Sequence, residues 1–94
     1  MNPFNIVVTT SGKQYRMTVE RKYLTDDMER FEVRAKNHTF LFDCNRPALS
    51  KENLGHLPWE WRLVAGSCPL YFQKEIQQEL EKHLRNKKPP VDIL

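Results

Sequence analysis

Residues 4–19 read FNIVVTTSGKQYRMTV, and this stretch decides the fold. Its first half places Phe4, Ile6 and Val8 at every second position, which is the period of a β-strand. Its second half repeats the pattern, with apolar residues at positions 15, 17 and 19. Between the two halves, Ser11-Gly12 supplies a turn, because glycine adopts a positive φ without steric cost. The stretch therefore predicts a β-hairpin.

Two further strands are expected after the hairpin. A turn-forming cluster, Thr25-Asp26-Asp27, precedes a segment in which Phe31, Val33 and Ala35 alternate with charged residues. Lys36-Asn37 is interpreted as a two-residue turn, since asparagine tolerates the left-handed conformation. The next strand would carry Phe40, Phe42 and Cys44 on one face, with Thr39, Leu41 and Asp43 on the other. Short turns between the four strands indicate an antiparallel meander.

Beyond Pro47 the pattern changes. The connection 46–58 is long for a compact domain, and one helical turn is expected between Ala48 and Leu54. A fifth strand is predicted over 59–64, where aromatic and apolar residues alternate with charged ones. A helix is predicted over 69–86, because apolar residues recur there at every fourth position: Phe72, Ile76, Leu80 and Leu84.

These elements predict an α+β fold in two layers, with a five-stranded antiparallel β-meander followed by one C-terminal α-helix packed on the apolar face of the sheet. Residues 1–86 form a single domain in this interpretation, and residues 87–94 form a flexible basic tail that contains two prolines. One helix does not cover five twisted strands. The sheet must therefore curl, or leave apolar surface for a partner.

The composition is that of a small soluble domain. Of 94 residues, 15 are Lys or Arg and 12 are Asp or Glu, so the net charge is +3. The N-terminus lacks the basic and long apolar regions of a signal peptide, and no apolar run approaches the roughly 20 residues of a membrane span. The only two cysteines, Cys44 and Cys68, are expected to be reduced thiols. The expectation is a cytoplasmic protein that does not contact membranes.

The sequence offers no motif for metal, nucleotide or hydrolytic chemistry. Its three histidines and two cysteines show no metal-ligand spacing: His38, His56, His83, Cys44 and Cys68. The three glycines are isolated, so no phosphate-binding loop exists, and no G-x-S-x-G elbow is present. His83 falls in the apolar stripe of the predicted helix and is expected to be half-buried, with Glu79 as a partner. We expect no cofactor, no metal and no enzymatic activity.

Cys68 is the candidate for a reactive thiol. It comes just before the predicted helix, where unpaired N–H groups and the positive end of the dipole favour a thiolate. A thiol-dependent enzyme built on it would need a base, and His56 is the available loop histidine. The competing interpretation makes Cys68 a small hydrophobic residue packed at the start of the helix. One cysteine and one histidine without a motif favour this second interpretation.

The basic and aromatic residues suggest a second class of function. Trp59 and Trp61 lie on one side of the predicted fifth strand, as core residues or as a stacking platform. On the outer face of the sheet, basic and acidic residues are interleaved, which is typical of a solvated face: Arg16, Arg34 and Arg62 with Glu20, Glu32 and Glu60. Binding of nucleic acid or another polyanion is the alternative function. It would use Arg46, Trp59 and Lys87-Lys88, although no basic cluster supports it.

The preferred hypothesis is a non-enzymatic protein-interaction module that binds a partner or itself. Val7 and Leu41 add apolar side chains to the outer face, and the predicted edge strand 4–9 has no charge to repel a second chain. A homodimer is therefore expected. In the rival hypothesis the connection 46–58 covers the remaining apolar surface with its leucines, and the protein is a monomer. The candidate binding residues are Arg46, Trp59, Val7 and Leu41.

Overall fold

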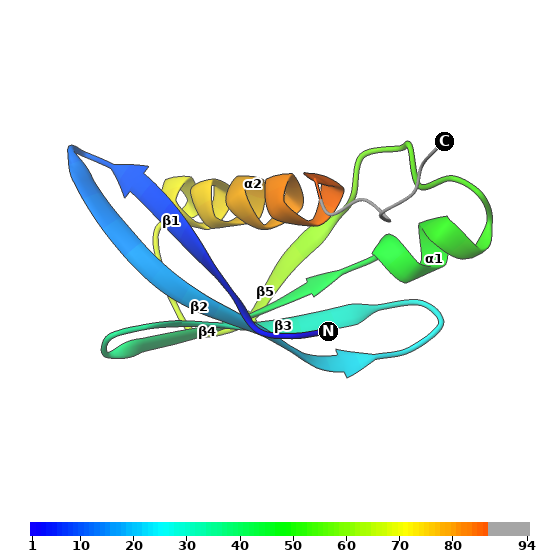
Figure 1. The fold of residues 1–94 in the computed structure, drawn as a ribbon, viewed down its shortest axis with the longest axis horizontal. Coiled ribbons are helices and arrows are strands. Elements are labelled where there is room, and N and C mark those ends of the chain that lie inside the picture. The colour runs from blue at the N-terminus through cyan, green and yellow to red at the C-terminus, as the bar shows by residue number, and fades with distance from the viewer. Residues whose placement is uncertain (87–94) are drawn as a thin grey trace.

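The computed structural model describes residues 1–86 as a five-stranded sheet with two helices. In chain order the elements are β1 (Phe4–Thr10), β2 (Lys13–Leu24), β3 (Glu29–Ala35), β4 (His38–Cys44), α1 (Arg46–Lys51), β5 (Trp61–Ala65) and α2 (Leu70–Asn86) (Figure 1). The tail predicted at 87–94 lies outside the described residues.

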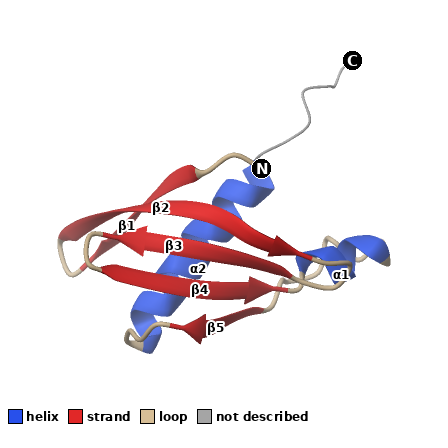
Figure 2. Ribbon diagram, turned by 90° about the horizontal axis from the view of Figure 1, so that it is seen from below, coloured by secondary structure: helices blue, strands red, loops and turns tan. Residues whose placement is uncertain are grey.

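The sheet is antiparallel, with strand order β1-β2-β3-β4-β5, so β1 and β5 are its two edges. Helix α2 runs diagonally across one face of this sheet, as Figure 2 shows from below. The predicted fold class is confirmed: a five-stranded meander is followed by one C-terminal helix, in two layers. Short turns dictate this order, and both residues of the first turn, Ser11 and Gly12, have positive φ as a tight hairpin requires.

Strand β2 is shared between two parts of the sheet. Its first half pairs with β1, and its second half pairs with β3 from Thr18↔Arg34 onward. Only Thr18 and Val19 pair on both sides. The β1–β2 hairpin therefore leaves the plane of the other strands and rises beside α2 (Figure 1). In this way the sheet curls around the single helix, one of the two outcomes that the sequence allowed.

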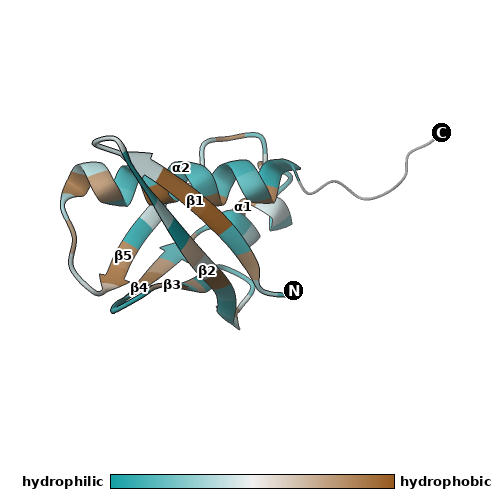
Figure 3. Ribbon diagram, turned by 60° about the vertical axis from the view of Figure 1, so that its left-hand side comes forward, coloured by the Kyte–Doolittle hydropathy of each residue, from teal (hydrophilic) through white to brown (hydrophobic). Residues whose placement is uncertain are grey.

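The core lies between the sheet and α2. The buried apolar residues come from the inward face of β1 to β4 and from one stripe of the helix: Ile6, Val8, Met17, Val19, Phe31, Val33, Phe40, Phe42, Cys44, Ile76, Leu80 and Leu84. Figure 3 shows that the middle of β1, beside α2, is strongly hydrophobic. Burial at the predicted period of two and four residues confirms the predicted inward faces of these strands and of the helix.

Several element boundaries differ from the predictions. Strand β5 begins at Trp61 rather than 59, since Trp59 belongs to the connection, and α2 begins at Leu70 rather than 69. The short helix α1 begins at Arg46 rather than 48, with Pro47 in its first turn, where the missing N–H costs nothing. In the β3–β4 turn, Lys36 rather than Asn37 has the positive φ.

The outer face of the sheet carries cross-strand ion pairs. The Arg34 guanidinium donates to Glu20 on β2 and to Glu32 on its own strand, and Lys22 lies within 3.9 Å of both carboxylates. The interleaved charges predicted for this face therefore pair with one another. Within residues 1–86, no helix combines the length and the apolar character needed to cross a membrane.

Candidate functional site

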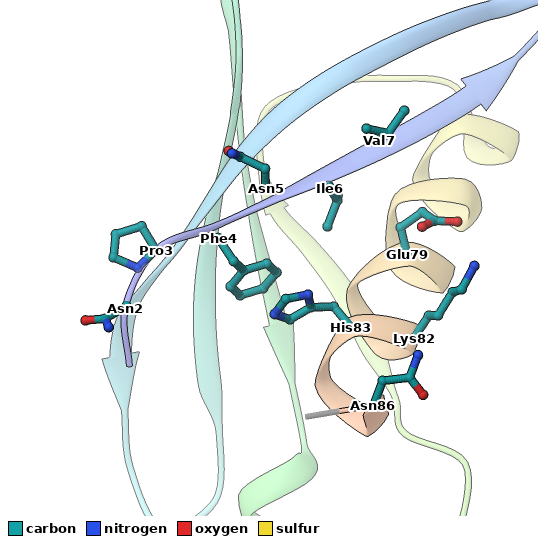
Figure 4. Close-up of a pocket in the computed structure, with 10 residues that line it drawn as sticks. All are labelled: Asn2, Pro3, Phe4, Asn5, Ile6, Val7, Glu79, Lys82, His83 and Asn86. Carbon is teal, nitrogen blue, oxygen red and sulfur yellow. The ribbon is translucent and has the colours of Figure 1, made fainter. Parts of the chain in front are cut away.

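The edge strand β1 and helix α2 form the walls of a groove of about 480 Å³ (Figure 4). The residues that line it are Asn2, Pro3, Phe4, Asn5, Ile6, Val7, Glu79, Lys82, His83 and Asn86. Strand β1 has β2 on one side only, so the backbone groups along its other side have no strand partner within residues 1–86. Such an edge is a template for pairing with another extended chain.

Phe4 and His83 join the two walls of the groove. Their rings stack, with centroids 3.8 Å apart and planes within 2° of parallel. Beside them Ile6, which is 5% exposed, points from β1 toward the helix (Figure 4). The prediction of a half-buried His83 is confirmed. These contacts hold β1 against the last turns of α2 and so set the shape of the groove.

The outward side of β1 is uncharged. Val7 is 40% exposed, and the Asn5 side chain accepts a hydrogen bond from the Thr18 hydroxyl at 3.1 Å. None of the seven residues of β1 is charged. The opposite edge, β5, carries Arg62 and follows directly after Glu60. Charged residues on an edge strand oppose pairing with another chain, so β1 is the unprotected edge of this sheet.

The helical wall of the groove has a charge gradient. Glu79, Lys82 and Asn86 line the groove, and Glu75 precedes them on the same side of α2 at spacings of four, three and four residues. The stripe is acidic at Glu75 and Glu79 and becomes basic at Lys82, toward the end of the helix. Among residues 1–86, Glu75, Glu79 and Lys82 form no salt bridge. The charges of the stripe are therefore available to a partner.

Arg46 lies elsewhere, bound to a buried carboxylate that the sequence analysis missed. Glu29 is 1% exposed, and it accepts hydrogen bonds from the Arg46 Nε at 2.6 Å and from an Arg21 Nη at 3.2 Å. Glu29 follows the Thr25-Asp26-Asp27 turn and was not assigned to a strand from the sequence, but it pairs with Cys44 inside the sheet. Its spacing from Phe31, two residues on, was the signal for an inward position. The charge of Arg46 is thus used within the domain.

Trp59 lies close to two guanidinium groups. Arg46 is 5.6 Å from the ring centroid and Arg85 of α2 is 4.0 Å from it, on the scale of cation–π contacts. Beside it, the Trp61 indole N–H donates to Glu81 at 3.2 Å, and Glu81 also accepts from Arg85 at 2.9 Å. The structure therefore brings Arg46 and Trp59 together. With Trp61, Glu81 and Arg85 they form a cluster that links the connection before β5 to the end of α2.

Of the four predicted binding residues, Val7 alone lines the groove. Leu41 is half-buried on the interior strand β4, and Arg46 and Trp59 belong to the cluster just described. The alternative function, polyanion binding through Arg46 and Trp59, is weakened because both side chains have partners inside the domain. Lys87-Lys88, the third element of that hypothesis, lies outside the described residues.

The surroundings of Cys68 do not favour a thiolate. Partial burial raises the pKa of the Cys68 thiol above its ordinary value, and burial raises the pKa of Cys44 to about 12. His56, the base that a thiol enzyme would need, is exposed and is not among the residues that line the hollow around Cys68. Both cysteines are free, as expected. The packing interpretation of Cys68 is the one that its surroundings favour.

Comparison with known proteins adds no family to this description. No protein-family model matches the chain, and neither a curated protein nor a solved structure matches it significantly. Within residues 1–86, no three His, Cys, Asp or Glu side chains gather as a metal site would require. The groove beside β1 is therefore the candidate site on its geometry alone.

Proposed function

We propose that this protein is a non-enzymatic interaction module that binds an extended chain along the free edge of β1, and that its partner is a second copy of itself. The observation that carries the proposal is an edge strand of seven residues with no charge, next to a groove. A strand added there satisfies the free backbone groups of β1 and places alternate side chains against α2. A reducing, cytoplasmic location is part of the proposal, and the two free thiols support it.

The sequence of β1 is compatible with pairing to itself. In an antiparallel pair about a two-fold axis at Val7, the two Val7 side chains lie opposite each other, and Asn5 lies opposite Thr9 of the second copy. No like charges meet in this arrangement. Apolar and small polar cross-strand pairs of this kind stabilise a sheet.

The charge gradient of α2 favours a two-fold partner over other partners. The helix runs antiparallel to β1: Phe4 meets His83 near its end, whereas Thr10 shares a hollow with Cys68 and Phe72 at its start. A two-fold axis at the edge of β1 therefore places the two helices antiparallel on the same face of a continuous sheet. The acidic half of each stripe then faces the basic half of the other, with Glu75 near the second copy's Lys82.

Light scattering from micromolar to high-micromolar concentration tests the proposal. The mass is expected to rise above the 11.2 kDa of the monomer toward twice that value. Val7→Lys places two lysines opposite each other at the axis and should hold the protein at the monomer mass. The matched control, Thr39→Lys, adds the same charge to an exposed outer-face position of the interior strand β4 and should not change the mass.

A charge exchange on α2 tests the two-fold geometry separately. Glu75→Lys should weaken the dimer, because the new lysine faces Lys82 of the second copy, and adding Lys82→Glu should restore it. A mass that stays at 11.2 kDa at every concentration would contradict the proposal. Equal behaviour of the Val7 and Thr39 variants would contradict it too.

A further inference from the structure

A second open backbone edge lies inside the sheet, where β2 separates from β3. Residues Lys13–Met17 of β2 pair with β1 but have no partner in β3, whose register with β2 begins at Thr18↔Arg34. The β1–β2 turn and the β3–β4 turn consequently diverge at one end of the molecule, near the start of α2 (Figure 1). This divergence leaves a gap between β2 and the β3–β4 turn. On the β2 side of the gap, backbone groups of Lys13–Met17 have no strand partner within residues 1–86.

The gap opens into two hollows of different chemistry. The first, of about 290 Å³, is lined mainly by apolar and aromatic side chains, among them Met17, Phe40, Cys68 and Phe72. The second, of about 680 Å³, is lined by Arg16, Arg34 and Lys36 together with uncharged residues. The two hollows share Tyr15, Ala35 and His38, so they meet at the gap.

The apolar hollow is built from side chains that face the core side of the sheet. The Tyr15 and Phe72 rings meet edge to face, with centroids 5.3 Å apart, and Tyr71 beside them is 59% exposed. The connection between β5 and α2 closes one side. It passes β4 so closely at Gly66 (φ 91) that an added Cβ would lie 2.6 Å from the Thr39 carbonyl oxygen. The hollow is thus a preformed place for a large apolar side chain.

The second hollow attracts anions. None of the residues that line either hollow, all within residues 1–86, is acidic. Arg34 is held by Glu20 and Glu32, but Arg16 and Lys36 form no ion pair with any described residue. Two unpaired cations beside an apolar hollow, with no carboxylate between them, suit a ligand that carries acidic and apolar groups close together.

We propose that this gap binds an extended peptide segment in which acidic and apolar residues alternate. A segment laid along Lys13–Met17 extends the free side of β2, and successive side chains of a strand point to opposite faces of a sheet. Its apolar side chains enter the hollow at Cys68 and Phe72, while its carboxylates meet Arg16 and Lys36. The site goes beyond the pairing of β1, because it uses the other side of the hairpin and needs no second copy.

The arrangement of cations and aromatic rings favours a peptide over a single-stranded nucleic acid. A single strand of nucleic acid carries one phosphate per nucleotide and gains affinity by stacking bases on aromatic rings along a basic groove. Here the two unpaired cations and the aromatic rings lie on opposite sides of one strand edge, which matches the alternating side chains of a peptide. Nucleic acid is nevertheless a defined outcome of the test.

The test follows backbone amide signals of ¹⁵N-labelled protein by NMR, which detects binding up to millimolar dissociation constants. The probe is a blocked pentapeptide with glutamate at its odd positions and phenylalanine at its even positions. We expect saturable shifts in Lys13–Met17 and in the β3–β4 turn. A peptide of the same composition with the two phenylalanines adjacent, and one with lysine in place of glutamate, should bind at least about tenfold more weakly.

Matched variants assign the contacts. Arg16→Glu and Lys36→Glu should each weaken binding at least about threefold, while Arg62→Glu, which changes an exposed arginine of the same sheet face on β5, should leave it unchanged. Binding should also slow alkylation of Cys68, with the buried Cys44 as an internal control. Val7→Lys should retain peptide binding, which separates this site from the proposed dimer.

Three results would overturn the inference. The first is equal binding of the alternating and rearranged peptides, since the strand period would then be irrelevant. The second is a set of shifts confined to β1, or no shifts at millimolar peptide. The third is stronger binding of an eight-nucleotide oligouridylate at the same amides, which would assign the gap to single-stranded nucleic acid.

Discussion

At the scale of single residues, Glu29 is the most deeply buried charged side chain among residues 1–86. Its carboxylate is buried, and the two arginines that bind it are about a quarter exposed at their side chains. Removing the charge from one partner of a buried ion pair leaves the other desolvated and uncompensated. Arg46 also contacts Trp59, so this pair anchors α1 and the connection that follows it.

Glu29→Gln is expected to lower the free energy of unfolding by about 3 kcal/mol, the low end for a broken buried pair because both arginines retain some solvent. Urea denaturation measures it. Asp27→Asn removes a carboxylate from the exposed pair with Lys51 and should change the free energy by less than about 0.5 kcal/mol. Equal effects of the two substitutions would show that the Glu29 pair contributes no more than a surface pair.

The Cys44 thiol predicts a dependence of stability on alkaline pH. Its pKa is about 12 in the folded state, against an ordinary value of 9.0. Below pH 9 the thiol is protonated in both states, and its contribution to stability is complete. As the pH rises from 9 toward 12, the unfolded chain loses this proton first, so the free energy of unfolding falls. In Cys44→Val the unfolding free energy should fall less steeply between pH 9 and pH 12. The measurement is urea denaturation at a series of pH values. The same pH dependence in both proteins would show that Cys44 is not the titrating group.

At the scale of elements, α2 is the helix that covers the apolar face of the sheet. Its stripe of Ile76, Leu80 and Leu84 is buried, and the stripe beside it forms the wall of the groove. The helix was predictable from its four-residue period, and the hairpin from its two-residue period, because both patterns are local. The open edge of β1 was predictable for the same reason, since the first strand of a meander lies at an edge.

Leu80→Ala is expected to cost about 2–5 kcal/mol of unfolding free energy, because a fully buried leucine leaves a cavity when truncated. Gln78→Ala, on the exposed side of the same helix, should stay within about 0.5 kcal/mol. Thermal or chemical denaturation distinguishes them. A loss below about half a kcal/mol for Leu80→Ala would mean that α2 is not seated on the sheet.

The remaining features depend on contacts between distant residues, and for that reason the sequence alone did not show them. Arg46 was predicted as a binding residue because nothing in its neighbourhood indicated Glu29, seventeen positions earlier, as its partner. Trp59 was assigned to a strand by alternation, but it lies in the connection before β5, where its ring contacts Arg85 near the end of α2. The effect of burial on the pKa of Cys68 also depends on tertiary packing, so the sequence alone could not decide between the thiolate and the packed thiol.

At the scale of the whole molecule, β2 pairs with β1 through its first half and with β3 through its second half, and we expect this change of partner to be a boundary for local opening. The β1–β2 hairpin and the β3–β4–β5 sheet share only two doubly paired residues, Thr18 and Val19. Strand β2 continues to pair with β3 as far as Leu24, whereas the tip of the hairpin, before Thr18, has no pairing with β3 and contacts the rest of the domain through side chains packed on α2. Local opening follows the boundaries of such units. The tip of the hairpin is therefore expected to open and close again without global unfolding. Its amide protons should then exchange with solvent faster than those of β3. A ligand bound to both β2 and the β3–β4 turn would slow this opening.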